Sequence, residues 1–123
     1  MNEKELTKLV CEYIKLQYPE TIFTIDTSGI RLTIGQATQM KSLRSDRGLP
    51  DLMIFEPRGK YHALFIELKR EGEIIRNRSG ELKTEHLREQ NAIHERLNAK
   101  GYYAAFACSF TEAKIIIDTY MHI

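Results

Sequence analysis

The spacing of apolar residues along the chain predicts three helices. In residues 2–18 apolar positions recur three and four apart, a spacing that places them on one face of a helix. The same spacing recurs in residues 84–99 and 109–120. Each segment begins with a residue whose side chain can cap a helix N-terminus, namely Asn2, Thr84 and Ser109. We therefore expect a helix over each of these segments.

Shorter apolar runs predict the strands of a sheet. Residues 21–26 alternate between apolar and polar positions, as in a half-buried strand. Residues 52–55 and 64–69 are two nearly continuous apolar runs, separated by a turn that contains one proline and one glycine. Such runs are typical of central strands that are covered on both faces. A fourth strand is expected over residues 102–108.

The order of these elements predicts an α/β fold in one domain, residues 1–123. The runs 52–55 and 64–69 should pair as an antiparallel hairpin. Strand 64–69, helix 84–99 and strand 102–108 form a crossover, so these two strands should be parallel neighbours. The sheet is therefore mixed. Helices on both faces would close it as a three-layer α/β/α sandwich with the element order αβββαβα.

Three segments fall outside this regular pattern. Residues 35–47 are polar and lack apolar periodicity, so we expect a functional loop there, with room for one helical turn around residues 40–43. Residues 70–83 contain two glycines and many charges and are expected to form a mobile loop, anchored by Ile74 and Ile75. Residues 27–29 should form a turn, and residues 30–34 should extend the strand before them or pair with it.

Composition restricts the class of protein. With 42% hydrophobic and 28% charged residues, the chain is typical of a globular domain. Its apolar runs are far shorter than the ~18 residues of a membrane helix, and its polar start is unlike a secretion signal. Cys11 and Cys108 have no CxxC spacing, so neither a disulfide framework nor a zinc site is expected. A cytoplasmic location follows from these features.

The end of the predicted hairpin carries the main candidates for chemistry. Asp51 begins the first strand, and Glu67 and Lys69 lie two residues apart near the end of the second, so the latter pair share one face. In an antiparallel pair the start of one strand lies opposite the end of the other, which brings all three side chains together. Carboxylates that share a site need compensation, and a hard divalent cation with oxygen ligands supplies it.

Two more polar residues lie where apolar residues are expected. Gln90 lies near the middle of the apolar stripe of helix 84–99, in place of a leucine. Glu3 falls inside the stripe of helix 2–18, one turn before Leu6. An acid at the frayed start of a helix would explain Glu3 equally well. If Glu3 instead faces the site, both helices contribute a side chain to the site at the hairpin end.

These residues resemble a known family. Pro50-Asp51 followed by Glu67-Leu68-Lys69 on adjacent strands resembles the PD-(D/E)xK nuclease superfamily, whose fold is restriction-endonuclease-like. Within it the chain is similar to the VRR-NUC (virus-type replication-repair nuclease) domains, especially the small stand-alone phage versions. The resemblance spans essentially the whole chain, except residues 36–46 and 71–83. It also includes Gly48-Leu49-Pro50-Asp51-Leu52, Gln90 and Gly101-Tyr102.

The resemblance implies hydrolysis of DNA phosphodiester bonds with Mg²⁺ or Mn²⁺. It assigns Asp51, Glu67 and the backbone carbonyl of Leu68 as metal ligands. Lys69 would orient or help deprotonate the attacking water and stabilise the developing negative charge. Gln90 would position Lys69, the water or the phosphate. For a phage-encoded protein, the expected location is the host-cell cytoplasm.

The start of the first helix carries a second part of the resemblance. Residues 2–6 resemble the acidic helix start of the same family and of archaeal-type Holliday junction resolvases. Glu3 would then reach the site directly or through metal-bound water and serve a second ion. By the same resemblance, four-way junction or branched DNA is an expected substrate and a homodimer an expected assembly, because two active sites are needed to cut two strands symmetrically.

The charge distribution also suits a polyanion. Residues 36–78 contain nine Lys or Arg against six Asp or Glu, a balance of +3. A solvated surface of mixed charge explains this balance as well. The candidates for contacts with the DNA backbone are Arg44, Arg47, Arg76 and Arg78.

Three classes of function follow from the sequence. The first is the nuclease. The second is a catalytically inactive nucleic-acid-binding module of the same fold, against which the complete set of two acids and a lysine argues. The third is a structural or protein-interaction domain, which would bind neither divalent metal nor DNA. The sequence leaves open whether the nucleic acid is DNA or RNA, and whether one or two ions act.

Overall fold

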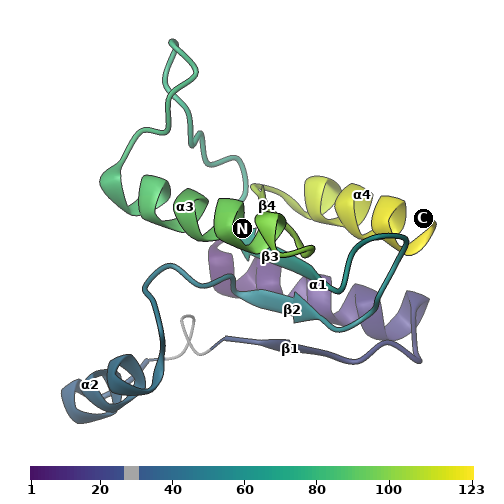
Figure 1. The fold of residues 1–123 in the computed structure, drawn as a ribbon, viewed down its shortest axis with the longest axis horizontal. Coiled ribbons are helices and arrows are strands. Elements are labelled where there is room, and N and C mark those ends of the chain that lie inside the picture. Colours follow the sequence, from purple (N-terminus) through teal and green to yellow (C-terminus); the bar gives the residue numbers. More distant parts are fainter. Residues whose placement is uncertain (27–30) are drawn as a thin grey trace.

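A mixed sheet with helices on both faces forms the centre of the computed structural model, which describes residues 1–26 and 31–123 (Figure 1). The strands are β1 (Phe23–Ile25), β2 (Leu52–Ile54), β3 (Leu64–Leu68) and β4 (Tyr103–Ala107), in the spatial order β1-β2-β3-β4. The helices are α1 (Glu3–Gln17), α2 (Ile34–Leu43), α3 (Glu85–Ala99) and α4 (Phe110–Met121). The predicted α/β architecture is confirmed, with α2 as an additional helix.

The strand pairing follows the predicted hairpin and crossover. β2 and β3 are antiparallel, with Leu52 opposite Ile66 and Ile54 opposite Leu64. β3 and β4 are parallel and are connected through α3. β1 pairs with β2 in the antiparallel sense. As a result, the start of β2 and the ends of β3 and β4 lie at one end of the sheet.

One face of the sheet packs against α1 and α4 and forms the main core. Alternate residues of β3, such as Ile66 and Leu68, point to this face and are buried. From α1 the stripe of Leu6, Val10 and Ile14 packs against them, as the sequence pattern predicts. The rest of this core is contributed by Leu52, Ile54, Leu64, Ala107, Ala113, Ile117, Tyr120 and Met121. Burial of this apolar area is the main stabilising contribution to the fold.

The opposite face of the sheet packs against α3, and its apolar cluster is smaller. It consists of Ala63, Phe65 and Ala104, with partly buried side chains such as Leu97 around them. These residues lie at the end of the sheet where β3 and β4 begin. At the other end of the same layer, buried polar side chains from β3 and α3 take the place of apolar ones. The layer between α3 and the sheet is therefore polar at the end of the sheet where β3 ends.

The expected loop over residues 35–47 is wrong up to residue 43, because residues 34–43 form α2, which includes the helical turn expected around residues 40–43. Residues 44–47 lie in no helix or strand, as expected. The helix begins with a capping box in which the Thr33 side chain accepts from the Gln36 backbone and the Gln36 side chain accepts from the Thr33 backbone. Across its ten described residues α2 buries no side chain, and Ile34 is 90% exposed. Apolar periodicity is absent from the sequence because α2 is held by local capping, not by packing against a core.

The segment before α2 also departs from expectation. Residues 31–33 are not in a strand, and residue 34 already belongs to α2, so the predicted extension or partner strand over residues 30–34 is not formed by the described part of that range. The predicted turn at residues 27–29 and position 30 lie outside the described residues.

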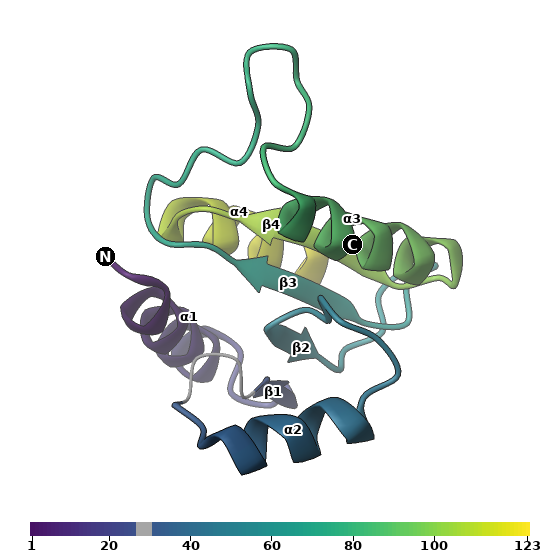
Figure 2. The ribbon, with the colours of Figure 1, turned by 90° about the vertical axis from the view of Figure 1, so that its left-hand side faces the viewer.

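Residues 70–83 form a loop that extends away from the sheet, above the first turn of α3 (Figure 2). The side chain of Asn77 organises its tip by accepting hydrogen bonds from the backbone of Ser79 and Glu81. Of the two predicted anchors, Ile74 is 70% exposed and does not anchor the loop, whereas Ile75 is half-buried and its carbonyl accepts a hydrogen bond of 2.9 Å from the Lys83 backbone. The buried residue is Leu82, at 8% exposure, which lies where the loop returns to α3.

Membrane-spanning helices and disulfides both bear on the compartment of the protein. Within residues 1–26 and 31–123, every helix is too short or too polar to cross a membrane. Cys11 and Cys108 are both free thiols.

The account of α2 predicts that it unfolds locally. Replacement of Thr33 by alanine removes the N-cap and should destabilise α2 by about 1 kcal/mol, without changing the free energy of global unfolding. The matched control is Thr84→Ala, which removes the same type of cap from the packed helix α3 and should lower global stability by about 1 kcal/mol. Amide hydrogen exchange and urea denaturation separate the two effects. Equal losses of global stability in both variants would show that α2 is packed in solution.

Candidate active site

Four polar side chains meet at the end of the sheet where β2 begins and β3 ends. Glu67 is 3% exposed, Lys69 is 6% exposed, and Gln90 of α3 is 4% exposed. Asp51 immediately precedes β2 and is partly buried. All four line one cleft of about 620 Å³. The structure thus brings together the residues that the hairpin geometry and the α3 stripe predict.

Gln90 connects the lysine to the glutamate. The Lys69 Nζ donates to Gln90 Oε1 at 2.8 Å, and Gln90 Nε2 donates to Glu67 Oε1 at 2.6 Å. An amide has both an acceptor oxygen and a donor nitrogen, so it can serve an ammonium and a carboxylate at once. A leucine at this position would leave two buried polar groups without a partner, which costs free energy. This explains why a polar residue lies in the apolar stripe of α3.

Asp51 is fixed by the backbone of β3. Its Oδ2 accepts a hydrogen bond of 3.0 Å from the backbone N–H of Leu68. In a strand, the N–H and C=O groups of one residue point to the same side, as the reciprocal bonds of an antiparallel pair require. The carbonyl of Leu68 therefore also points toward the β2 side, where Asp51 lies. This direction suits the predicted role of that carbonyl as a ligand.

The carboxylates of Asp51 and Glu67 repel each other when both are ionised, so the doubly ionised site is unfavourable. Burial is the largest cause that raises the pKa of Glu67, and a hydrogen bond and the charge of Asp51 raise it further, to about 10. Lys69 acts in the opposite direction but does not compensate. Without another cation, Glu67 therefore keeps its proton at neutral pH. Two carboxylates, one buried and one partly buried, form the kind of hard oxygen site that binds Mg²⁺ or Mn²⁺.

The donor set for a cation is small. Among the described side chains, no group of three or more His, Cys, Asp or Glu residues is arranged to hold a metal ion. A cation would depend on the Asp51 and Glu67 carboxylates together with main-chain oxygen and water. Mg²⁺ commonly binds proteins in this way, through one or two carboxylates and several waters. The residues therefore fit the implied metal.

Glu3, the predicted contributor from α1, lies on the wall of the same cleft. Burial is the main cause that raises the pKa of its carboxyl, and the nearby Lys69 opposes this effect. Asp51 adds to the upward shift, so the three side chains share one electrostatic environment. The first turn of α1 is therefore directed toward the hairpin end.

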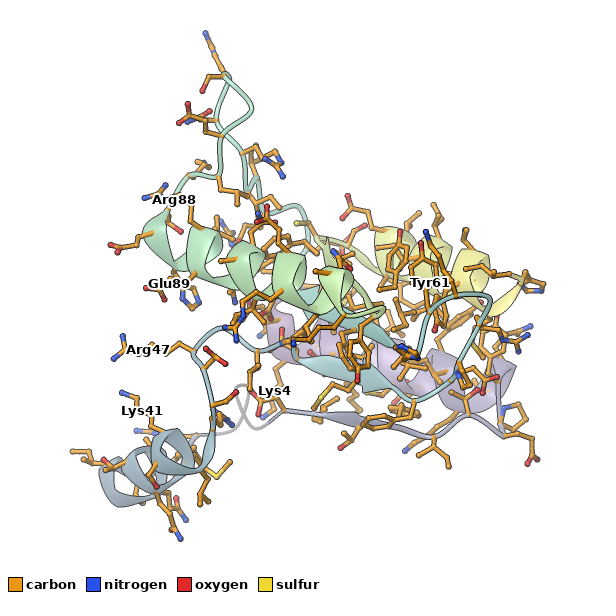
Figure 3. The ribbon with its side chains drawn as sticks, viewed as in Figure 1. Lys4, Lys41, Arg47, Tyr61, Arg88 and Glu89 are labelled. Carbon is orange, nitrogen blue, oxygen red and sulfur yellow. The ribbon has the colours of Figure 1, made fainter. Side chains whose placement is uncertain are left out.

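A second cleft of about 610 Å³ opens from the same carboxylates toward the segment that precedes β2. Arg44 and Arg47 line it, and Arg44 forms an ion pair with Asp26 at 2.6 Å. Figure 3 shows Arg47 and Lys41 at the same end of the molecule as Glu89 of α3, far from Tyr61 at the other end. Two of the four predicted DNA contacts thus lie beside the site.

The other two predicted DNA contacts lie apart from it. Arg76 and Arg78 belong to the loop of residues 70–83 and line neither of the two clefts described above. The Arg76 Nη1 donates to the carbonyl of Gly80 within the loop. Both arginines are exposed. They would reach DNA only where it extends beyond the clefts.

Two histidines near the site were not singled out by the sequence. His86 lines both clefts and lies one helical turn before Gln90. That spacing of four residues is the signal that would have indicated it. His94 is 2% exposed and packs against Phe106, with ring centroids 4.5 Å apart. Burial lowers the pKa of His94 to about 4, so it remains neutral.

Gly48 allows the segment before β2 to pass close to α3. Its φ is +74°, and a Cβ built there would lie 3.2 Å from the Cα of Gln90. The left-handed backbone and the close approach both favour glycine. The segment that carries Asp51 is thereby held against the helix that carries Gln90.

Comparisons with known proteins support the same fold. No protein-family model matches the chain, and no curated protein sequence matches it. A solved structure described as "VRR_NUC domain protein" matches with a TM-score of 0.71 and 24% identity, over 99% of this chain and 89% of that chain. A structure described as "VRR_NUC domain" matches with a TM-score of 0.56 and 20% identity, over 96% of both chains. The chain therefore has the fold of these VRR_NUC domains, and the resemblance seen in the sequence is confirmed at the level of the fold.

The contact between Gly48 and α3 can be tested against a glycine of the same conformation. Gly48→Ala should destabilise the protein by more than Gly72→Ala, because Gly72 has φ +77° but nothing within 4 Å of a Cβ built there. Left-handed strain of about 1–2 kcal/mol is common to both variants. The difference in their unfolding free energies, measured in urea, reports the contact with Gln90. If the two variants lose the same free energy of unfolding, the segment around Gly48 is not in close contact with α3.

The raised pKa of Glu67 predicts a characteristic dependence of stability on pH. The pKa in the folded protein, about 10, lies above the ordinary value of 4.5, so folding favours the protonated acid. In metal-free protein this preference destabilises the folded state increasingly as the pH rises above 4.5. Glu67→Gln removes the effect, so the variant should gain stability over wild type progressively as the pH rises from about 5 into the mildly alkaline range. The advantage should vanish near the ordinary pKa of a glutamate. Urea denaturation with EDTA across this range measures it, and parallel curves for the two proteins would contradict the assignment.

Proposed function

We propose that this protein is a VRR-NUC-type endonuclease that hydrolyses DNA phosphodiester bonds with Mg²⁺ or Mn²⁺. The observation that carries the proposal is the pair of carboxylates, Asp51 and Glu67, beside a lysine whose position is fixed by Gln90. The fold shared with VRR_NUC domains supports it. An inactive module of this fold would not need to keep Glu67 and Lys69 buried beside a second acid, since burial of charged groups costs stability.

The metal ligands would be Asp51, Glu67 and the backbone carbonyl of Leu68. Glu3 would contribute from the wall of the cleft, directly or through water, and would serve a second ion if one binds. A bound divalent ion would polarise a phosphoryl oxygen and lower the pKa of a coordinated water. It would also replace the proton that Glu67 otherwise keeps, because both compete for the same carboxylate oxygens.

Lys69 would act on the attacking water and on the phosphate. Its ammonium group has a defined position, because it donates a hydrogen bond of 2.8 Å to Gln90 Oε1. A fixed positive charge in a recessed site stabilises the negative charge that develops on the phosphoryl oxygens. The same ammonium would orient the water for in-line attack. Gln90, which is hydrogen-bonded to both Lys69 and Glu67, would keep the ammonium close to Glu67.

DNA would approach the site at the end of the sheet. Arg44 and Arg47 would contact the backbone beside the scissile phosphate, because they line the cleft that begins at the carboxylates. Arg76 and Arg78, on the projecting loop, would contact a more distant part of the substrate. Such phosphate contacts provide affinity and position without reading the sequence.

The proposal extends to a homodimer that acts on four-way junction or branched DNA. One site of this kind cuts one strand, so symmetric cleavage of two strands needs two copies. β1 is an edge strand of the sheet as described, and Ile22, which precedes it, is 71% exposed. On α2, Leu43 is 73% exposed. These exposed apolar side chains provide a surface on which a second copy would pack.

A cleavage assay tests the proposal. Purified protein is incubated with labelled four-way junction, flap, linear duplex and RNA substrates, with Mg²⁺, Mn²⁺ or EDTA. Wild type should cleave DNA only with metal, and Asp51→Asn and Glu67→Gln should lose at least about a thousandfold in rate, since each replaces a negatively charged ligand with a neutral one. Lys69→Met should lose a hundredfold or more, by analogy with removal of a charge-stabilising donor.

The matched carboxylate control is Glu20→Gln, an exposed position just beyond α1 that should leave the rate unchanged. Light scattering measures the mass in solution, and paired nicks at symmetric positions of the junction would accompany a dimer. Absence of cleavage of every substrate by wild type would refute the enzyme. DNA binding that persists without turnover would instead favour the inactive binding module.

A further inference from the structure

A straight row of lysines leads away from the candidate active site along α1. Lys4, Lys8 and Lys15 all line the cleft that contains Asp51 and Glu67, and all three are exposed. At 100° per residue their directions fall within about 40° of one another, so they form one line on the helix surface. The row is about 16 Å long at 1.5 Å per residue.

The three lysines of the row have no ion-pair partner among the described residues, and their mutual repulsion lowers the stability of the helix. Lys4 and Lys8 are four residues apart, where like charges destabilise a helix by roughly 0.2–0.5 kcal/mol. None of the three lysines forms an ion pair with the residues that the structure describes. Apart from Glu3, the acid on this wall is Glu12, which lies to one side of the row by about 40–80° of rotation. Three free ammonium groups in line suit an extended polyanion.

The opposite wall of the groove suits the less polar parts of a nucleotide. It is formed by Ile25, which is 41% exposed, and by Asp26. The charge of Asp26 is offset by its ion pair with Arg44. Between the lysine row and this wall lie Thr7 and the half-buried thiol of Cys11. Phosphates can thus face the lysines while sugars and bases contact Ile25.

The groove along α1 and the second cleft meet at the carboxylates. Both are lined by Asp26, Asp51, Glu67, His86 and Gln90. From that point one leads past the α1 lysines and the other past Lys41, Arg44 and Arg47. A nucleic acid strand whose scissile phosphate lies at the carboxylates can therefore continue in two directions, with cations on each side. Figure 3 shows Lys41 and Arg47 at this end of the molecule and Lys4 nearer its middle.

We propose that the cleaved strand lies along α1 on one side of the scissile phosphate, with Lys4, Lys8 and Lys15 contacting its phosphates. This inference rests on the proposed nuclease function and adds a binding surface outside the metal site. The length of the row matches several phosphates of one strand, at their axial spacing of about 3.4 Å. The Arg44 and Arg47 cleft holds the strand on the other side.

Salt dependence of binding tests the surface without requiring turnover. The double variant Lys8→Ala/Lys15→Ala is compared with Lys60→Ala/Lys100→Ala, which removes two exposed lysines at the opposite end of the sheet. Lys4 is left intact because it adjoins Glu3. Binding of a labelled flap oligonucleotide is measured in EDTA over a range of salt. The slope of log affinity against log salt should fall by about 1.4–1.8 for the α1 variant, since each phosphate contact contributes about 0.7–0.9. The control should keep the wild-type slope.

Cross-linking locates the strand. In Cys108→Ser protein, Cys11 lies beside the lysine row as the remaining thiol, and oligonucleotides carry an activated disulfide tether on single phosphates along the cleaved strand, so that thiol–disulfide exchange releases the leaving thiol. A mildly alkaline buffer is used, because burial raises the pKa of Cys11. Disulfides should form with phosphates on one side of the cleavage point only. A Cys11→Ser/Cys108→Ser/Lys60→Cys protein should not cross-link at any of these positions.

Failure of this inference differs from failure of the enzyme. If wild type cleaves but the α1 variant keeps the wild-type salt slope, or if cross-links form equally on both sides or not at all, the strand does not follow α1. If wild type cleaves no substrate with any metal, the proposed function itself is wrong. A reduced slope with one-sided cross-links supports the surface.

Discussion

The hydrogen-bonded link from Lys69 through Gln90 to Glu67 is the interaction on which the candidate site depends. It places three polar side chains in a layer that is otherwise the core between α3 and the sheet. Most buried polar groups are hydrogen-bonded, and the Gln90 amide provides a partner for each of its two neighbours. The approach of Gly48 to Gln90 then holds the Asp51 segment against the same helix. The geometry of the site is thus part of the packing of the fold.

The remaining cost of this arrangement is the pair of acids, Asp51 and Glu67. No side chain in the described part of the chain fully compensates them, since the pKa of Glu67 stays at about 10 even with Lys69 nearby. A divalent cation would relieve the repulsion and convert a destabilising pair into a binding site. Around this centre lie three exposed surfaces, namely α2, most of the 70–83 loop and the solvent-facing side of α1 (Figure 2). The proposed substrate contacts lie on these surfaces, and the proposed chemistry lies at the end of the sheet.

Much of this site could be predicted from the sequence, because its residues break a pattern or follow a strict one. Alternation along β3 places Glu67 and Lys69 on one face, and the hairpin brings Asp51 to them. Gln90 is visible as a polar residue within an apolar stripe. In contrast, α2 leaves no apolar periodicity to find, because Thr33 and Gln36 stabilise it locally. The lysine row of α1 shares a helix with the core stripe, but only the tertiary structure shows that it borders the cleft of Asp51.

Proton release on metal binding is the most direct test of the central claim, that Asp51 and Glu67 form a divalent-metal site. Calorimetric titrations of Mg²⁺ and Mn²⁺ into the protein at neutral pH, in buffers of different ionisation enthalpy, count the protons released per ion. Because Glu67 holds a proton in the metal-free protein, wild type should release about one proton per ion bound at this site. Glu67→Gln should bind more weakly and release none, whereas Glu20→Gln should behave as wild type. Absence of binding in wild type, or the same proton release from Glu67→Gln, would contradict the account.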